Sequence, residues 1–508
     1  MNNNLYQILF DEFKNFENNI CFDVPGQRKW SFKDVDILSS FFVSYLRRLG
    51  LKKGDRIISQ TEKSIASVGL YLACLRGGII YTPLNTSYTL SEVEYFIENI
   101  KPKLFVCSPD RLKKISLTCE KLDIPNYRAL GTSQDDPFLE EILGLEQDNK
   151  LEQCYEDDTA AILFTSGTTG KSKGAMITHG NLSSNAFALK QSWGFTRNDT
   201  LLHALPIFHV HGLFVALHTA LLSASKIIFL EKFDTSQVNE SLKEASVMMG
   251  VPTFYNRLIS EEGFDKNIYT GVRLFISGSA PLTEKTFSEF KDKTDHSILE
   301  RYGMTETGMI TSNPLLGDRI EGTVGFSLPD IEIRARKDNK ILPSNEKGVI
   351  EVRGPNVFKG YWQMEEKTKE EFTEDGFFIT GDIGQIDDDG RLTLSGRSGD
   401  MIISGGYNVY PKEIEIILNT INGIQESAVI GAKHEDFGEC PIAILVSEDS
   451  NNLISDDYIN SLLQESLAKY KIPKSYIWIN SLPVNAMGKV QKKDLRDKYD
   501  KILLGNLK

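Results

Sequence analysis

A segment rich in glycine, hydroxyl and lysine side chains directly follows a short apolar run. The run is Ala160 to Phe164, and the segment is Thr165-Ser166-Gly167-Thr168-Thr169-Gly170-Lys171-Ser172-Lys173-Gly174. Glycines let a backbone approach a ligand closely, and successive amides with hydroxyls form a concavity that binds anions. We therefore predict a loop that grips a triphosphate, against the alternative of a flexible polar loop. It is not a P-loop, because the leading glycine of that pattern would fall at Thr165.

Three later stretches combine turn residues with groups that act in phosphoryl chemistry. They are Tyr302-Gly303-Met304-Thr305-Glu306-Thr307, Thr380-Gly381-Asp382 and Pro483-Val484-Asn485-Ala486-Met487-Gly488-Lys489. A carboxylate suits Mg²⁺, and a lysine is a point charge on a long stem that can reach a transition state from another domain. Taken alone, Asp382 is equally well a hairpin-turn residue and Lys489 a surface lysine, so both assignments depend on context.

The elements that must position these residues begin with an alternation of apolar runs and helical patterns between Thr159 and Arg301. The predicted strands are Ala160 to Phe164, Leu201 to Leu205, Lys226 to Leu230, Val247 to Gly250 and Val272 to Ile276, and the predicted helices are Ser183 to Ser192, Leu213 to Leu222, Ser236 to Glu244 and Thr253 to Glu261. This alternation predicts an α/β fold with parallel sheets flanked by helices. Ligands in such folds sit at the carboxyl ends of strands.

The pattern changes after Glu321. Ile331 to Arg336 alternates strictly, which predicts an antiparallel strand with one face in water, and Asp389-Gly390 predicts a hairpin turn. The composition changes again after Gly396-Arg397-Ser398-Gly399-Asp400. We expect a small antiparallel β part, then a small α+β domain on a short linker.

Composition limits the class of partner. A chain of 508 residues predicts two or more domains, and a net charge of −13 disfavours a nucleic-acid partner. Six cysteines without C-x-x-C spacing predict reduced thiols rather than disulfides or a zinc site. The N-terminus lacks a signal-peptide pattern, and the most apolar early stretch, Ile65 to Leu75, is too short to cross a bilayer. We expect a buried helix there and a cytoplasmic protein without a membrane span.

Two clusters superficially suggest metal sites. Histidines 203, 209, 211 and 218 lie close in sequence but lack the i, i+4 pairing with a carboxylate that helical metal sites use. The run Asp387-Asp388-Asp389-Gly390 lacks the spacing and the closing glutamate of an EF-hand. Neither cluster is therefore predicted to bind a metal.

Taken together, the motifs resemble those of the acyl-adenylate-forming superfamily, which includes acyl-CoA synthetases, adenylation domains of peptide synthetases, and luciferases. They occur in the family's order, from about residue 25 to residue 496: the phosphate loop, the second ATP motif, the ribose motif, the hinge region of Gly396-Arg397 with Gly405-Gly406, and the C-terminal lysine motif. The resemblance implies attack of a carboxylate on the α-phosphorus of ATP, release of pyrophosphate and transfer of the acyl group to coenzyme A (CoA).

The resemblance also implies a role for each matched residue. The residues expected around the phosphates are Thr165, Ser166, Gly167, Thr168, Thr169, Gly170 and Lys173, with Glu306 and Thr165 at Mg²⁺ and Thr305 at the α-phosphate. The residues expected around the nucleoside and CoA are Tyr302, Gly303, Gly278, Ser279 and Ala280 at adenine, Asp382 and Arg397 at ribose, and Gly405 and Gly406 at CoA. Lys489 would stabilise charge on the carboxylate and the α-phosphate, and His209 would gate the acyl pocket, near Ser277 and Met304.

The same resemblance divides the chain into an ATP- and acid-binding domain (1–396), a hinge (397–400) and a mobile C-terminal domain that carries the catalytic lysine (401–508). One small-domain placement cannot easily serve both adenylation and thiol attack, so we expect rotation between the steps. The family's usual pivot, often Asp or Lys, falls here on Gly399, which is a departure. Glycine reaches backbone angles closed to other residues, which favours an easy rotation.

Other functions stay open at this point. The acceptor could be a carrier protein, as in an adenylation domain, or the chemistry could be that of a luciferase-like oxygenase. A nucleotide-binding regulatory protein would need neither Glu306 nor Lys489. No carrier-like segment follows Lys489, so CoA is expected as the acceptor. Ser277-Gly278-Ser279 lacks the flanking glycines of a nucleophile elbow, which argues against a serine hydrolase.

The acid is expected to be malonate. The stretches that are similar to those of malonyl-CoA synthetases are Gly250 to Leu258, Glu300 to Thr307, Thr311 to Pro314 and Met487 to Lys492. Methylmalonate or another short carboxylic acid is the alternative. A malonate pocket needs a fixed cation, because burying the distal carboxylate unpaired is costly. We predict Arg257 as this cation, with Ser277 and His209 adding hydrogen bonds. The alternative is a surface arginine paired with Glu261.

Overall fold

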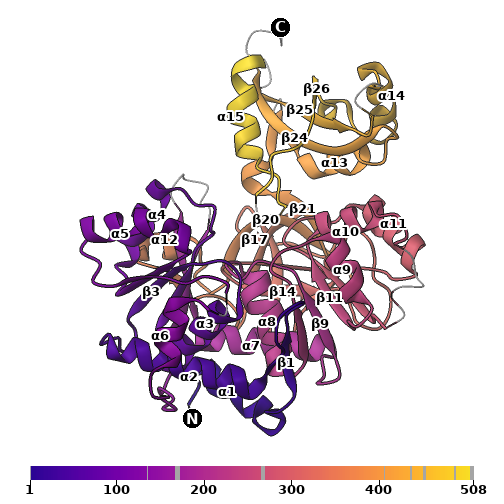
Figure 1. Ribbon diagram of the computed structural model, residues 1–508. Coiled ribbons are helices and arrows are strands. Elements are labelled where there is room, and N and C mark those ends of the chain that lie inside the picture. The colour runs from indigo at the N-terminus through magenta and orange to yellow at the C-terminus, as the bar shows by residue number, and fades with distance from the viewer. Residues whose placement is uncertain are drawn as a thin grey trace.

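The computed structural model describes residues 2–133, 135–165, 172–264, 269, 271–404, 407–434, 438–449, 453–485 and 488–503. The N-terminal part contains three sheets, and the C-terminal domain forms a separate lobe, drawn in yellow at the top of Figure 1. The fold is therefore α/β with a small second domain, as the sequence predicted.

The first sheet positions the phosphate loop. Its order is β19-β8-β7-β4-β3-β5-β6. The strands are β3 (Arg56–Gln60), β4 (Ile80–Pro83), β5 (Leu104–Cys107), β6 (Tyr127–Ala129), β7 (Thr159–Thr165), β8 (Lys173–Thr178) and β19 (Gly360–Tyr361). Strands β3 to β7 pair in parallel, whereas β8 runs antiparallel to β7 and to β19. The loop between β7 and β8 therefore leaves the carboxyl end of a parallel strand.

The second sheet positions the predicted nucleoside and acid residues. Its order is β15-β14-β13-β12-β11-β9-β10-β1-β2. The strands are β1 (Ile20–Asp23), β2 (Trp30–Ser31), β9 (Thr200–His203), β10 (Lys226–Phe229), β11 (Val247–Gly250), β12 (Leu274–Ser277), β13 (Leu299–Met304), β14 (Gly308–Ser312) and β15 (Phe326–Ser327). The run from β1 through β10, β9, β11 and β12 to β13 is parallel. All five strands predicted between residues 159 and 301 are confirmed to within two residues at each end.

Helices cover these sheets, and one is fully enclosed. They are α1 (Leu5–Phe13), α2 (Phe32–Arg48), α3 (Ile65–Gly77), α4 (Leu90–Ile100), α5 (Leu112–Lys121), α6 (Pro137–Leu143), α7 (His179–Ser192), α8 (Leu217–Leu222), α9 (Thr235–Leu242), α10 (Pro252–Ser260), α11 (Glu284–Thr294) and α12 (Glu365–Glu370). Every residue of α3 is buried, which confirms the buried helix predicted at Ile65 to Leu75. It begins at the capping box of Ser64 and ends at Gly78, whose φ of +63° lies in the left-handed region that favours glycine. None of the described helices is long and apolar enough to cross a bilayer.

One predicted helix differs. Leu213 to Leu222 was expected to be α-helical, but the chain forms a π-helix, η3 (His211–Ala216), before α8. Gly212 packs so closely against the preceding loop that a Cβ there would lie 2.1 Å from the carbonyl oxygen of Pro206. Such wide turns are rare and occur often at functional sites.

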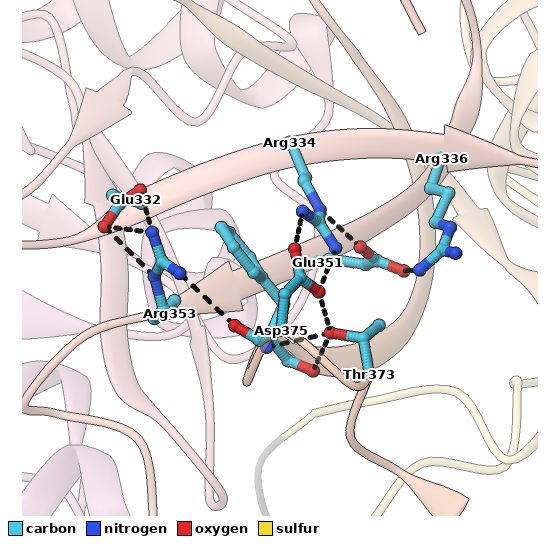
Figure 2. A network of polar contacts seen from close by, with 8 residues as sticks. Glu332, Arg334, Arg336, Glu351, Arg353, Thr373 and Asp375 are labelled. Atoms are coloured by element: carbon cyan, nitrogen blue, oxygen red, sulfur yellow. Dashed lines mark hydrogen bonds and ion pairs between the residues drawn. The ribbon is translucent and has the colours of Figure 1, made fainter. Parts of the chain in front are cut away.

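A third, antiparallel sheet follows, in the order β17-β16-β18-β20-β21. Its strands are β16 (Glu332–Lys337), β17 (Lys340–Ile341), β18 (Gly348–Arg353), β20 (Phe378–Ile386) and β21 (Leu392–Arg397). The predicted alternating strand is β16, and a turn at Gly390 (φ +87°) joins β20 and β21. Figure 2 shows the charged face of this sheet, where Arg334 donates to Glu351 at 2.6 Å.

The C-terminal domain has its own core. Its strands are β22 (Ile402–Ser404), β23 (Tyr407–Val409), β24 (Ile424–His434), β25 (Gly438–Ser447) and β26 (Tyr476–Ile479), and its helices are α13 (Pro411–Leu418), α14 (Asp456–Ser466) and α15 (Lys492–Leu503).

Short 3₁₀ turns complete the fold: Lys14–Phe16, Pro109–Arg111, Ser398–Asp400 and Lys469–Lys471. The turn at Ser398–Asp400 joins the last strand of the large part to β22, which is where the sequence predicts the hinge.

Candidate active site

The predicted phosphate loop begins and ends at two described residues. Thr165 is the last residue of β7 and Lys173 the first of β8. The remaining predicted loop residues, Ser166, Gly167, Thr168, Thr169 and Gly170, lie outside the described residues. The ammonium of Lys173 pairs with Glu371 at 3.2 Å and lies 4.1 Å from the centre of the Tyr361 ring. Lys173 is therefore held at the mouth of the loop.

Glu306 is a buried carboxylate between the two larger sheets, 5% exposed. It accepts hydrogen bonds from the hydroxyl of Thr165 at 3.2 Å and from that of Tyr361 at 3.0 Å. Burial, and then the charge of Glu306, raise the pKa of Tyr361 well above its ordinary value, so Tyr361 keeps its proton and donates it. Tyr361 was not predicted as a site residue, because nothing in its sequence context marks it.

A second carboxylate lies beneath the predicted ribose position. Asp382 accepts from the hydroxyl of Tyr302 at 2.5 Å and pairs with Nε of Arg397 at 2.8 Å. Burial opposes the charge of Arg397, but Asp382 and its other neighbours raise the pKa of the guanidinium. Asp382 and Arg397 face each other across the register of β20 and β21. The structure thus brings together three residues that the sequence assigned to one nucleoside.

Lys489 reaches this region from the C-terminal domain. Desolvation lowers the pKa of its ammonium and Arg397 lowers it further, while Asp382, Asp400 and Glu306 oppose the shift. Its backbone forms a tight turn with Asn485, with N–H···O distances of 3.0 and 2.9 Å. Gly488, at φ +73°, lies so close to the large domain that a Cβ there would be 3.0 Å from Thr253 of α10. The lysine therefore docks next to the predicted ATP site.

Ion pairs hold this placement. Lys285 of α11 pairs with Glu448 at 2.6 Å, and Lys347 pairs with Glu413 of α13. Both pairs join the large part to the C-terminal domain. Gly405 and Gly406, predicted to contact CoA, lie outside the described residues.

A buried arginine with unpaired nitrogens lies beside the strand ends. Arg301, on β13, is 4% exposed, and among the described residues its Nε and Nη2 have no hydrogen-bond partner. The same is true of the hydroxyl of Ser277, at the end of β12. Gly278 leaves room for the guanidinium, since a Cβ there would lie 2.4 Å from Cζ of Arg301. Burial lowers the pKa of Arg301 to about 9, which leaves it charged at neutral pH.

Two histidines complete this polar cluster. Nδ1 of His211 lies 3.2 Å from the hydroxyl of Ser279, and its Nε2 has no partner among the described residues. The backbone N–H of His211 donates to Nδ1 of His209 at 3.3 Å. Burial, together with the charges of Arg301 and Lys489, lowers the pKa of His209 to about 4. His209 is therefore neutral at physiological pH, and the charges of the buried arginine and of the docked lysine both act on it.

Arg257 occupies a different environment from the one expected. It is exposed on α10, and no ion pair with Glu261 is present among the described residues. Two residues earlier, the hydroxyl of Tyr255 donates to the carbonyl of Ile276 at 2.6 Å, so the buried side of α10 is occupied by an aromatic ring. In the sequence, Arg301 stands inside the Glu300 to Thr307 motif, where no strand was predicted and only its charge distinguishes it.

The other predicted residues lie around the same strand ends. Met304 is the last residue of β13, followed by Thr305, which lines a cavity of about 20 Å³ with Asn185, Phe214 and Gly308. Gly303 packs tightly, because a Cβ there would lie 2.1 Å from the carbonyl of Gly308. Ala280 follows β12 and Ser279, whose φ of +72° is unusual for a residue with a side chain.

Comparisons with known proteins agree with this geometry. The family described as AMP-binding enzyme matches residues 9–362, and its C-terminal domain matches residues 413–489. A crystal structure of ATP-bound MatB from Rhodopseudomonas palustris has a TM-score of 0.96 and 46% identity, covering 99% of this chain and 100% of that one.

Two curated relatives are similar over most of their length. The malonate–CoA ligase of Arabidopsis thaliana is 36% identical over 489 residues, which is 88% of this chain and 78% of that protein. The mitochondrial malonate–CoA ligase ACSF3 of Mus musculus is 33% identical, covering 88% and 83%. Because both parts of the family match, over residues 9–362 and 413–489, the chain belongs to the AMP-binding enzyme family.

Proposed function

We propose that the protein is an ATP-dependent acid–CoA ligase that forms an acyl-AMP and then an acyl-CoA, with malonate as its acid. The names of its relatives support this reaction: both curated relatives described above are malonate–CoA ligases, and MatB binds ATP in the matching crystal structure. The presence of both a buried Glu306 and a Lys489 docked next to the same region favours turnover over simple nucleotide binding.

The observation that carries the choice of acid is that Nε and Nη2 of Arg301 have no hydrogen-bond partner among the described residues. A buried polar group without a partner is costly, so a protein that retains one requires an occupant for it. Malonate differs from a monocarboxylic acid of similar size by a distal negative charge. A guanidinium can hold that carboxylate through two parallel hydrogen bonds, and Ser277 and His211 offer further polar atoms beside it. We therefore assign the distal carboxylate to Arg301 rather than to the exposed Arg257.

The first half-reaction needs the reacting carboxylate and the α-phosphate of ATP to meet with their charges neutralised. We propose that Lys489 lies against both groups. Asp382, which Tyr302 and Arg397 hold in place, would accept hydrogen bonds from the ribose hydroxyls. His209, which is neutral, would line the pocket for the acid without adding charge to it. Thr305 and the phosphate loop would hold the phosphates.

The residues present also fit Mg²⁺. Glu306 and Thr165 offer a carboxylate and a hydroxyl, the hard oxygen ligands that this cation prefers. No group of three or more His, Cys, Asp or Glu side chains able to hold a metal is found among the described residues. One carboxylate with substrate phosphates is the usual way in which Mg²⁺ is bound in ATP sites. When bound, the ion would neutralise the departing phosphates.

A pair of arginine variants tests the choice of acid. Arg301→Leu should lower kcat/KM for malonate by a factor that corresponds to about 2–5 kcal/mol of lost transition-state stabilisation, the usual cost of leaving a charged partner unpaired. Activity on butyrate should hold or rise. Arg257→Leu is the matched variant and should leave the malonate-to-butyrate ratio unchanged. The measurement is acid-dependent pyrophosphate release on malonate, methylmalonate and butyrate. A ratio that falls in Arg257→Leu and not in Arg301→Leu would return the role to Arg257.

The acceptor is tested separately. Wild-type enzyme with malonate and ATP should convert free CoA to a thioester without a carrier protein. Pyrophosphate release without thioester formation would favour the carrier-loading alternative and would leave the adenylation chemistry intact.

A further inference from the structure

Lys63 is a buried cation for which adenylation has no direct use. It follows β3, precedes α3 and is 7% exposed. Its ammonium donates to Nδ1 and to the carbonyl oxygen of His203, both at 2.9 Å, and lies 4.2 Å from the centre of the Phe229 ring. Among the described residues it forms no ion pair. Burial lowers the pKa of Lys63 well below its ordinary value, and Glu231 opposes that shift. Because burying a lysine is costly, we expect the contacts of Lys63 to contribute to structure or function.

The ring of His203 connects Lys63 to the π-helix through two hydrogen bonds. It is fully buried at the end of β9, and its Nε2 lies 2.9 Å from the carbonyl oxygen of Gly212. A carbonyl only accepts, so Nε2 carries the proton and Nδ1 accepts from Lys63. Burial and the charge of Lys63 lower the pKa of His203, which keeps this single tautomer. The chain of hydrogen bonds therefore runs in one direction, from Lys63 through His203 to Gly212.

Gly212 belongs to the segment that lines the acid pocket. Its neighbour His211 contacts Ser279, and His209 just before it accepts from His211. Gly212 has no room for a side chain, because the carbonyl of Pro206 lies 2.1 Å from where a Cβ would be. The Gly212 carbonyl also accepts from the backbone N–H of Leu217 within the π-helix, so the contact with His203 ties that turn to β9. A hydrogen bond that fixes the Gly212 carbonyl therefore also fixes the positions of His209 and His211, which belong to the same segment.

We propose that Lys63 and His203 are positioning residues for acid binding, which hold the His209–Gly212 segment at the correct distance from Arg301 and Ser277. The inference rests on the proposed function, because it concerns the acid pocket of that reaction. Neither residue is a contact of the ATP site described above. Their loss should therefore weaken binding of the acid and leave binding of ATP nearly unchanged.

The test uses the full-length enzyme with malonate and ATP varied separately. Lys63→Met keeps the length of the side chain but removes its hydrogen bonds, and should raise KM for malonate about tenfold with KM for ATP within about twofold. His203→Leu should do the same. His203→Gln keeps an N–H that can reach Gly212 and should stay near wild type. His179→Gln is the matched control, since His179 is also buried and bonded to backbone, at Leu5.

A purely structural role predicts something else. It would lower Tm in Lys63→Met and His203→Leu without separating the two KM values, or would make His203→Gln as damaged as His203→Leu, and either result overturns the proposal. If Lys63→Met does not fold, the two His203 variants carry the comparison. If the wild type activates no carboxylic acid, the proposed function fails before any variant is compared.

Discussion

We propose that the charge of Lys489 serves only the first of the two chemical steps. It lies near Asp382 and Glu306, where the carboxylate and the α-phosphate would meet, and desolvation lowers its pKa. A positive charge placed at developing negative charge acts by electrostatic stabilisation. The thioester step starts from an acyl-AMP whose pyrophosphate has already left, so we expect it to depend less on this charge.

We predict that Lys489→Ala loses acid-dependent pyrophosphate release by about 10²–10³-fold, the usual effect of removing one stabilising group from a transition state. The variant should still convert supplied malonyl-AMP and CoA to the thioester. The two half-reactions are measured separately, and Lys493→Ala serves as the neighbouring-lysine control. Equal loss in both half-reactions would contradict this division of roles.

Single residues were predictable where a motif surrounds them. Glu306, Asp382 and Arg397 lie in short stretches with their own turns, and the structure brings them to one region. The sequence predicts Arg257 and the structure leads us to propose Arg301, because periodicity cannot tell which of two arginines is buried with nitrogens that lack a partner among the described residues. That property depends on Gly278, which follows the neighbouring strand β12 and leaves space for the guanidinium.

At the scale of elements, the charged face of the antiparallel sheet depends on one buried carboxylate. Glu351 of β18 is 2% exposed and accepts from Arg334 of β16 at 2.6 Å, with Arg336 farther away at 3.5 Å. Arg334 also stacks on Phe377 at 3.8 Å. Figure 2 shows Arg353 at the other side, paired with Glu332 at 2.7 Å.

We predict that Arg334→Leu destabilises the protein by about 3 kcal/mol, because it leaves Glu351 buried with only a distant partner. Arg353→Leu is the matched control and should change Tm little, since its pair with Glu332 is exposed. Thermal unfolding of both variants at pH 7 measures the difference. Equal shifts in Tm would show that burial of Glu351 is not what matters.

Elements with a simple period were predictable, and those shaped by contacts were not. The strand Val247–Gly250 was predicted with its exact limits, because four apolar residues stand between clear boundaries. The helix α7 begins four residues before its predicted start, at a capping box of Thr178 and Asn181 that precedes the apolar pattern. The π-helix could not be predicted, because it arises from the approach of Gly212 to Pro206.

At the scale of the whole molecule, Glu300 lies at the contact between the two domains. Burial raises its pKa to about 7, while Lys412 of α13 and the backbone N–H groups of Leu282 and Gly322 oppose that shift, and Glu284 adds to it. A raised carboxyl pKa means that the folded state binds the proton more tightly than the unfolded state. Its contribution to stability is therefore fully present below about pH 4.3 and is lost as the pH rises through 7.

We predict that Glu300→Gln removes the loss of stability that the wild type shows as the pH rises through 7. The Tm of the variant should exceed that of the wild type above pH 7, and the difference should shrink toward pH 5. Lys412 keeps Glu284 and Glu415 as nearby charges in the variant. Thermal unfolding between pH 5 and 8.5 provides the measurement, and a difference independent of pH would show that Glu300 does not titrate in this range.

The domain boundary was predictable only from a change in composition and the family's motif order. The 3₁₀ turn at Ser398–Asp400 lies where the hinge is proposed, and Arg496 of α15 pairs with Asp400 at 2.5 Å. How the small domain docks could not be predicted, because Lys285 and Glu448 are far apart in sequence and look like ordinary surface charges.

These interdomain pairs make ionic strength a control on the molecule. Lys285 and Glu448 are both partly exposed and lie 2.6 Å apart, so their attraction weakens as added salt shortens the Debye length from about 10 Å in 0.1 M salt to about 3 Å in 1 M salt. Lys489, which we propose serves adenylation, is carried by the domain that these pairs hold. Dissolved salt would therefore shift the balance between docked and released forms without any dedicated effector, and the enzyme's two half-reactions would respond to its ionic surroundings in opposite directions.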